Sequence, residues 1–286
     1  MIFKDKTVII TGGSEGVGAA AARQFAEAGA NLMLVARSKK NLERIAEELR
    51  SKTHVEIFAM DVSDPDACVD VFKKAVFEFG GVDILVNNAG YHCRGPVEEV
   101  DAADLARMID VNLKAPIVLS RIAVSYLRAS KAGAIINVGS LAGRTPVPGS
   151  VCYAASKAGL RSFTYGLGVE LADSNIKIAI VSPGPIDTGF IMADIDATSD
   201  LTFSQPISTA EEVAQAILDL CGNSHREQSM PWFSGILTTV MYLFPRLGIV
   251  TRPMLEKKGA RIKAGIKAER KRQSNEEKKG DSTGGA

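Results

Sequence analysis

Tryptophan, histidine and cysteine are scarce in this chain of 286 residues, which has one Trp, three His and four Cys. The histidines, His54, His92 and His225, are far apart, and no two cysteines form a Cys-x-x-Cys pair. The sequence therefore predicts neither a metal site nor a disulfide framework. Reduced cysteines, and an N-terminus that leads directly into an apolar run without a signal-peptide pattern, favour a cytoplasmic location.

Long apolar segments are also missing. The run from Ile236 to Phe244 spans nine residues and ends at Pro245 and Arg246, whereas a helix needs about 20 apolar residues to cross a bilayer. No transmembrane helix is expected. The composition, 46% hydrophobic and 23% charged, is nevertheless that of a globular protein with a packed core.

The net charge is only +1, but it is unevenly distributed. Residues 252–279 hold eleven Lys/Arg against four Asp/Glu, a local charge of +7. Residues 1–251 carry about −5. This pattern indicates a basic tail on a mildly acidic body, and not a nucleic-acid-binding domain.

Short apolar runs alternate with helical patterns along the first three quarters of the chain. The expected strands cover residues 6–11, 31–36, 55–60, 82–90, 135–140 and 177–184. No linker divides residues 1–225. Strict βα alternation predicts an α/β fold, a single Rossmann-type, doubly wound parallel sheet with a C-terminal apolar and basic extension.

A glycine-rich loop follows the first expected strand and opens a helix. Its spacing is Gly-x3-Gly-x-Gly at Gly12, Gly16 and Gly18. Backbone N–H groups at a helix N-terminus bind anions, so the loop predicts a phosphate site. A tight strand–helix turn without a ligand is the alternative.

The second strand ends in Ala36 and Arg37, where a dinucleotide site usually has an acid for the ribose hydroxyls. Arg37 could pair with a 2′-phosphate, which favours NADP over NAD. Glu15 in the glycine loop opposes this preference. Asp61, at the end of the third strand, is a candidate acceptor for an adenine amine or else a helix cap.

Ser140, Tyr153 and Lys157 have the spacing Ser-x12-Tyr-x3-Lys. On a helix, Tyr153 and Lys157 share one face, and a nearby cation lowers a tyrosine pKa from about 10. Such a phenol is a candidate proton donor and acceptor. Asn112 is expected near the middle of a helix at 101–128, although Asn is a poor helix former, so its side chain is a candidate functional group.

Together these motifs resemble the classical short-chain dehydrogenases/reductases over roughly residues 5–222. The matching stretches are TGGSEGVG (11–18), Asp61, NNAG (87–90), Asn112, Ser140, YAASK (153–157) and PGPIDT (183–188). The resemblance implies an NAD(P)-dependent enzyme with a catalytic tetrad of Asn112, Ser140, Tyr153 and Lys157. Tyr153 would transfer the proton, Lys157 would lower its pKa and hold the nicotinamide ribose, Ser140 would orient the carbonyl, and Asn112 would support a proton relay.

The resemblance also implies a cofactor site, NADP(H) being favoured over NAD(H). The cofactor-binding residues it implies are Thr11, Gly12, Ser14, Glu15, Gly16, Val17, Gly18, Arg37, Asp61, Val62, Asn88, Ala89, Gly90, Tyr153, Lys157, Pro183, Gly184, Ile186 and Thr188. Members of the family usually form homodimers or homotetramers, through helices that correspond to 101–128 and 152–174.

The chain departs from soluble members after residue 222. A Gly-Gly-rich end is missing, and the apolar segment 230–250 precedes the basic tail. This segment is expected to be either an interfacial anchor, with peripheral membrane contact through 230–272, or a seventh strand and a helix packed on a partner subunit. In this respect the chain is similar to ketosphinganine reductases and some hydroxysteroid dehydrogenases.

The sequence thus predicts an NADP(H)-dependent oxidoreductase that reduces a carbonyl, or oxidises an alcohol, on a lipophilic substrate such as a long-chain ketone. A small carbonyl, a 3-oxoacyl thioester or a steroid is the alternative substrate, and a non-catalytic dinucleotide-binding regulator is the alternative class. Residues 1–225 are expected to form the catalytic domain, 226–255 an apolar extension and 256–286 a mobile basic tail. The loop 189–206 is the expected substrate lid.

Overall fold

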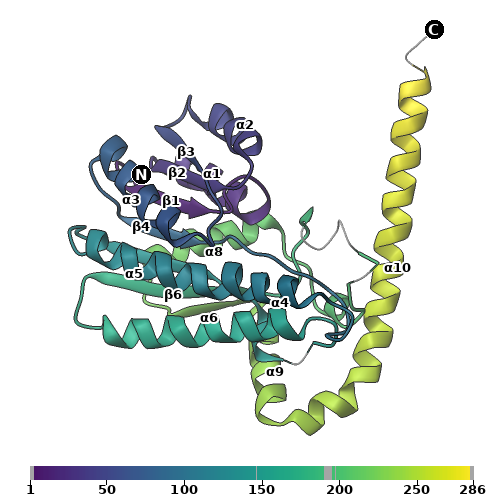
Figure 1. The fold of residues 1–286 in the computed structure, drawn as a ribbon. Coiled ribbons are helices and arrows are strands. Elements are labelled where there is room, and N and C mark those ends of the chain that lie inside the picture. Colours follow the sequence, from purple (N-terminus) through teal and green to yellow (C-terminus); the bar gives the residue numbers. More distant parts are fainter. Residues whose placement is uncertain (1–2, 146, 190–194, 197, 284–286) are drawn as a thin grey trace.

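The computed structural model describes residues 3–145, 147–189, 195–196 and 198–283. Its centre is a sheet of seven parallel strands in the order β3-β2-β1-β4-β5-β6-β7 (Figure 1). The strands are β1 Thr7–Thr11, β2 Asn31–Ala36, β3 Val55–Ala59, β4 Ile84–Asn87, β5 Gly133–Val138, β6 Ile176–Pro183 and β7 Glu227–Met230. The predicted doubly wound parallel sheet is confirmed.

Helices cover both faces of the sheet (Figure 1). On one face α1 (Gly16–Glu27), α2 (Lys39–Leu49) and α8 (Ala210–Gly222) pack into one apolar cluster. On the other face α3 (Pro65–Phe79), α5 (Ala115–Leu127) and α6 (Val151–Glu170) enclose a second cluster. The central strands are buried on both sides, which explains why TVIIT in β1 is apolar or β-branched throughout and fully buried.

The chain order reverses between β1 and β4, which are neighbours in the sheet. At such a switch point the loops after adjacent strands diverge and leave a crevice beyond the carboxyl ends of the strands. The fold therefore places the ends of β1, β4, β5 and β6, which carry most of the predicted site residues, around one opening.

The helix predicted at 101–128 is interrupted. It consists of α4 (Ala102–Ile109), a π-helical turn η1 (Asp110–Lys114) and α5. A π-turn inserts an extra residue into the helical ladder and is frequent at functional sites. Asn112 lies inside η1 and is fully buried.

The C-terminal extension consists of one short strand followed by two helices. β7 pairs in parallel with β6 from Glu227 to Met230, so the sheet runs past residue 225. Two helices follow, α9 (Trp232–Leu243) and α10 (Pro245–Thr283). Figure 1 shows α9 below the sheet and α10 rising along one side of the molecule, its last turns standing away from the body. None of the helices described combines the length and the apolar character needed to cross a membrane.

Candidate active site

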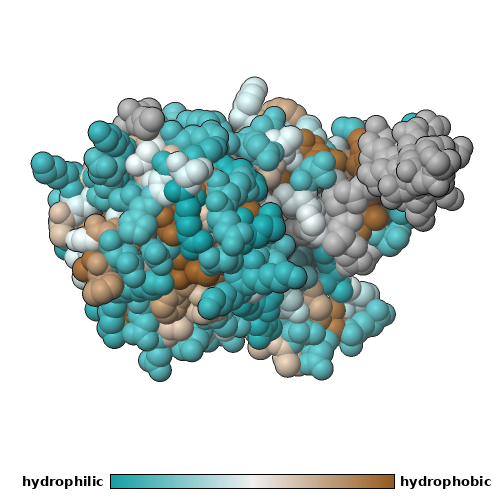
Figure 2. All heavy atoms as spheres, turned by 90° about the horizontal axis from the view of Figure 1, so that it is seen from above, coloured by the Kyte–Doolittle hydropathy of each residue, from teal (hydrophilic) through white to brown (hydrophobic). Residues whose placement is uncertain are grey.

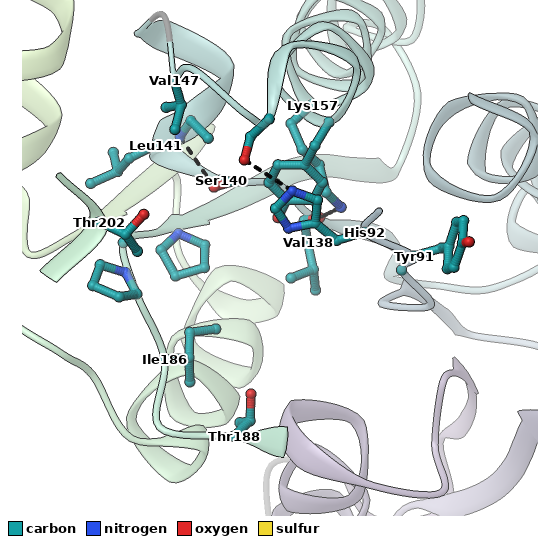
Figure 3. Close-up of a pocket in the computed structure, with 18 of the residues that line it drawn as sticks. Tyr91, His92, Val138, Ser140, Leu141, Val147, Lys157, Ile186, Thr188 and Thr202 are labelled. Carbon is teal, nitrogen blue, oxygen red and sulfur yellow. Dashed lines mark hydrogen bonds between the residues drawn. The ribbon is translucent and has the colours of Figure 1, made fainter. Parts of the chain in front are cut away.

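A cavity of about 1240 Å³ lies beyond the carboxyl ends of the strands. Most of the predicted site residues line it, namely Gly12, Ser14, Glu15, Gly16, Val17, Arg37, Asp61, Val62, Asn88, Ala89, Gly90, Ser140, Tyr153, Lys157, Pro183, Gly184, Ile186 and Thr188. In Figure 3, Ile186 and Thr188 lie across the cavity from Ser140, His92 and Lys157. Thr11, Gly18 and Asn112 are predicted site residues that do not line it.

Ser140 follows β5 in extended conformation and begins the 3-10 turn η2 (Leu141–Arg144). Its Oγ accepts a hydrogen bond of 3.1 Å from the backbone N–H of Ala142. The same hydroxyl is hydrogen-bonded to the Tyr153 side chain. The Ser140 hydroxyl thereby both caps the turn and contacts the phenol of Tyr153. These two contacts hold Ser140 beside the proposed proton donor.

Tyr153 and Lys157 occupy the first two turns of α6. The buried Lys157 Nζ donates a hydrogen bond of 2.9 Å to the backbone oxygen of Val138 and lies 5.8 Å from the centre of the Tyr153 ring. The helix spacing thus brings the two side chains to the same wall of the cavity, as the sequence predicts.

The expectation that Lys157 lowers the pKa of Tyr153 is wrong for the protein alone. Burial raises the pKa of Tyr153, and the hydrogen bond from Ser140 and the charge of Arg94 only partly oppose it. Burial also lowers the pKa of Lys157 to about 8. The physical reason is desolvation, which penalises both the phenolate and the ammonium. At neutral pH the site therefore holds a neutral phenol beside a charged amine.

Asn112 lies behind the cavity wall. Its Oδ1 accepts from the Tyr91 N–H at 2.7 Å, and its Nδ2 donates to the Tyr91 carbonyl at 2.8 Å and to Ser156 Oγ at 3.2 Å. The amide thereby joins the loop after β4 to α6. In this structure Asn112 holds the backbone of Tyr91 in place. Its part in a proton relay stays a prediction.

The loop after β4 adds two side chains that the sequence analysis missed, His92 and Arg94, and both line the cavity. The His92 ring stacks on the Tyr153 ring at 4.2 Å between centroids, and its Nε2 lies 3.1 Å from Ser150 Oγ. Burial, together with the charges of Arg94 and Lys157, lowers the pKa of His92 to about 3. His92 is therefore neutral at physiological pH. Its place two residues after NNAG indicates only that it lies in a loop at the site; its role depends on the packing.

The glycine loop, the predicted anion cradle, packs tightly against the loop after β4. Gly12 has a φ of +67°, and a Cβ there would lie 2.7 Å from Asn88 Nδ2 and 3.0 Å from Ala89 Cα. Only glycine fits this contact between the loops after β1 and β4. The buried Thr11 supports it, because its Oγ1 accepts from the Asn88 and Ala89 N–H groups. Thr11 thus shapes the loops instead of facing the cavity.

The residues proposed to bind the adenosine end of the cofactor differ in exposure and in hydrogen bonding. Arg37 and Glu15 are exposed at the cavity rim, on which Ser38 and Asn41 also lie. Asp61 is already paired: Oδ2 accepts from Arg107 at 2.7 Å, and Oδ1 from Ser63. These hydrogen bonds outweigh burial and lower the pKa of Asp61. The helix cap at α3 is Asp64, so the capping alternative for Asp61 does not apply.

The other end of the cavity is built by segments beyond the recognised motifs. The segment 198–205 contributes Leu201 and Thr202, α9 contributes Leu237 and Met241, and α10 contributes further residues. The α10 residues are Pro245, Gly248, Ile249, Arg252 and Leu255. The predicted lid at 189–206 is only partly covered, since residues 190–194 and 197 lie outside the described residues.

A group of His54, Glu56 and Glu78 lies on the β3 side of the fold, with ligand atoms within 4.8 Å of one another. The sequence gives no hint of it, because the three are not close in a motif. Lys74 Nζ already pairs with Glu56 at 3.2 Å. The group is remote from the cavity residues and supplies nothing to them.

Comparison with known proteins identifies the fold and site together. The family model described as short chain dehydrogenase matches residues 6–198 of this chain. The chain belongs to the short chain dehydrogenase family. The sulfoacetaldehyde reductase 2 of Chromohalobacter salexigens is 39% identical to this dehydrogenase over 73% of the chain and 86% of the relative. The cis-4-hydroxycyclohexanecarboxylate dehydrogenase of Sinomonas cyclohexanicum is 34% identical over 78% and 91%.

Solved structures support the same assignment. A short chain dehydrogenase from Burkholderia cenocepacia in complex with NADP superposes with a TM-score of 0.73 at 32% identity, over 79% of this chain and 96% of the other. A metagenomic short-chain oxidoreductase in complex with NADP gives 0.68 at 29% identity. This dehydrogenase is thus an oxidoreductase with a Rossmann-like fold, and the cavity at the switch point is its candidate active site.

Proposed function

We propose that this dehydrogenase uses NADP(H) to reduce a carbonyl to an alcohol, or to run the reverse reaction, on a lipophilic substrate. The observation that carries the reaction class is the arrangement of Ser140, Tyr153 and Lys157 on one wall of a cavity whose other end is a glycine cradle. A phenol with a hydroxyl partner suits proton transfer, and the cradle suits a pyrophosphate.

The residues present fit a dinucleotide. The backbone N–H groups at the start of α1, where Gly16 has a positive φ, can approach phosphate oxygens closely. Lys157 would hold the nicotinamide ribose, and Ile186 and Thr188, which lie across the cavity from it, would hold the carboxamide. When bound, the cofactor would supply the hydride chemistry, and the protein would supply orientation and electrostatics.

The protein's own part in reduction is proton delivery. Tyr153 donates its phenolic proton to the carbonyl oxygen, which becomes the alcohol hydroxyl. Ser140 donates a hydrogen bond to the same oxygen and orients it. Lys157 stabilises the phenolate that remains. Because the structure holds the phenol neutral in the protein alone, the acid is present at neutral pH before the substrate binds.

NADP is preferred because no carboxylate follows β2, where Arg37, Ser38 and Asn41 line the rim instead. A 2′-phosphate could pair with the guanidinium of Arg37. The similar solved structures bound to NADP support this choice. Glu15 on the same rim limits the preference, and replacing it with Gln is expected to tighten NADPH binding.

The substrate end favours a lipophilic molecule. Leu141, Leu201, Leu237, Met241 and Ile249 line it, and all but Leu141 come from the extension or from the segment after β6 that follows the family match. Apolar side chains that line a pocket add affinity for a ligand through apolar burial.

A small anionic carbonyl is the second candidate. Arg94 and Arg252 line the cavity, and the charge of Arg94 reaches Tyr153. A guanidinium near the reacting carbonyl suits a carboxylate or sulfonate. The names sulfoacetaldehyde reductase and cis-4-hydroxycyclohexanecarboxylate dehydrogenase point the same way for the relatives.

A coupled screen tests the function. Oxidation of NADPH and of NADH is measured against long-chain ketones, steroids, 3-oxoacyl thioesters and small keto acids. Tyr153→Phe is expected to lower kcat by about 10²–10⁴-fold while NADPH affinity is unchanged, because only the proton donor is removed. Unchanged turnover in the variant would refute the catalytic assignment. Cofactor binding without turnover on any class would favour a dinucleotide-binding regulator.

We further propose that the substrate is met at a membrane surface through residues 230–272, and that the protein forms a homodimer or homotetramer through α4, α5 and α6. The family resemblance supports the oligomer, and the apolar character of α9 supports the membrane contact.

A further inference from the structure

Twelve large apolar residues between Trp232 and Met254, on α9, the start of α10 and the residue that joins them, are exposed to solvent. Nine of them, here called the apolar α9–α10 surface, are Trp232, Phe233, Ile236, Val240, Leu243, Phe244, Leu247, Val250 and Met254. Trp232, Ile236, Val240 and Leu243 have the spacing of one face of α9, and Leu247, Val250 and Met254 have the spacing of one face of α10. Trp232 and Val250 are 71% and 77% exposed. An apolar area that extends over two consecutive helices marks a docking surface.

Cations lie next to this surface. Arg246 is exposed beside Phe244, and Lys257, Lys258 and Arg261 follow along α10. The last three lie beside Met254 and Ile262 on the surface of α10. Apolar side chains next to amines and a guanidinium suit an amphiphile with an anionic headgroup.

The chemistry favours a lipid surface over a second copy of the chain. Two copies that meet through this surface by a two-fold axis would bring the same patches, and hence the same cations, close together. Anionic headgroups would instead neutralise them. Trp232 and Tyr242, both exposed, are residue types that prefer the level of lipid headgroups. Figure 2 views the molecule from above, from the side opposite to α9 in Figure 1. The face it shows is mainly hydrophilic, with separate apolar areas.

The helices that carry the apolar α9–α10 surface also line the active-site cavity. Leu237 and Ile249 are 38% and 71% exposed, and both line the cavity. Ile236 and Val250, which adjoin them in the chain, belong to the apolar surface. Apolar side chains therefore lie at the cavity as well as on the exposed surface of the same helices.

The same helix holds part of the cavity wall. Lys263 Nζ on α10 donates to the Thr198 carbonyl at 2.7 Å and pairs with Asp200 at 3.2 Å. Gly259 packs so closely that a Cβ would lie 1.8 Å from the Asp200 carbonyl oxygen. These contacts hold the segment that carries Leu201 against α10. If α10 docks on a partner, the mouth of the cavity therefore lies next to that partner.

We propose that the apolar α9–α10 surface docks on a bilayer that contains anionic phospholipid and presents the mouth of the active-site cavity to it. The route for the substrate rests on the proposed lipophilic carbonyl, whereas the docking itself rests on the exposed side chains and their charges. The partner is therefore a lipid surface with net negative charge.

Co-sedimentation of the full-length protein with vesicles tests this inference. Phosphatidylcholine vesicles are compared with vesicles that also contain phosphatidylglycerol. Leu243→Glu/Val250→Glu changes exposed apolar residues that do not line the cavity. Phe77→Glu is the matched control, because Phe77 is 85% exposed on α3, away from this surface. Lys257→Glu/Lys258→Glu/Arg261→Glu tests the cations.

The wild type and Phe77→Glu are expected to sediment with the anionic vesicles. The apolar variant should bind at least ~10-fold more weakly, and the charge variant about 100-fold more weakly at low salt. NADPH oxidation with a water-soluble ketone, measured on each preparation, reports whether the variant is folded and tests the proposed function separately.

Two results would overturn the docking proposal. One is wild-type protein that stays in solution with both vesicle types while it oxidises NADPH, which leaves the proposed function standing. The other is a larger oligomer that Leu243→Glu/Val250→Glu dissociates, with no vesicle binding, since a second copy then covers the surface.

Discussion

The most unusual group at the residue scale is Lys157, a buried amine whose pKa burial lowers to about 8. The unfolded chain keeps the ordinary value near 10.5, so between pH 8 and 10.5 it binds more protons than the folded protein. Below pH 8 both states are protonated, and the folded state carries the full cost of burying the charge. Stability should therefore rise with pH across this interval.

Lys157→Met removes this dependence. Relative to the variant, the wild type is expected to gain up to about 3 kcal/mol of unfolding free energy between pH 7.5 and 10.5. Urea unfolding at several pH values measures it. Lys131→Met, at an exposed lysine, should follow the wild type. A wild type and a Lys157→Met variant with parallel pH curves would show that the buried amine keeps its ordinary pKa.

The site residues that belong to a motif with fixed spacing could be predicted from the sequence. Ser140, Tyr153 and Lys157 meet on one wall because helix periodicity and the end of β5 place them there. His92 was not predictable in the same way, since its role depends on the stacking of its ring on Tyr153. The direction of the Tyr153 pKa was also missed, because desolvation is a property of the packed site and not of a spacing.

At the scale of elements, a buried charge cluster joins the catalytic turn to the extension. Arg144, at the end of η2, donates to Gly235 O at 3.0 Å and to Ser229 Oγ at 3.0 Å, and it pairs with Glu227 on β7. Glu227 also pairs with Arg161 at 2.9 Å. Burial alone would raise the pKa of Glu227, but hydrogen bonds from Arg161 and its other partners lower it.

Arg144→Met is expected to destabilise the protein by about 3 kcal/mol, because it leaves a buried carboxylate with one fewer cation and frees the α9 carbonyl. Arg161→Met should cost less, since that side chain is 36% exposed. Chemical denaturation measures both. Glu227→Gln in addition to Arg144→Met should cost less than the sum, and strict additivity would show that the two groups do not interact.

The elements themselves were largely predictable up to β6, where apolar runs and helical patterns alternate regularly. Two features were not. A seventh strand was one of the two alternatives for 230–250, but the polar sequence EQSM does not mark its position at Glu227–Met230, which depends on the pairing with β6. The interruption of the 101–128 helix by η1 depends on the bonds of Asn112 to Tyr91, which join segments far apart in the chain.

At the scale of the whole molecule, the sheet and the contacts of Arg144 extend past the predicted domain end at residue 225. β7 and the partners of Arg144 all follow that residue. Truncation tests where the catalytic unit ends. A chain of residues 1–225 loses the edge strand and the Glu227 carboxylate, so the buried Arg144 is left without its counter-ion. This chain is expected not to fold cooperatively.

A chain of residues 1–244 keeps the sheet, α9 and the Arg144 cluster but loses Lys263 and Gly259, which hold the segment 198–205. It should bind NADPH like the full-length protein and show a raised KM with a smaller change in kcat, because the wall of the substrate end is loosened while Tyr153 stays in place. A chain of residues 1–268 retains both contacts and serves as the control with wild-type kinetics. Steady-state kinetics and thermal unfolding on the three chains measure these outcomes. A fully active 1–225 chain would show that β7 and the extension are dispensable, and an unchanged KM in 1–244 would show that α10 does not shape the substrate end.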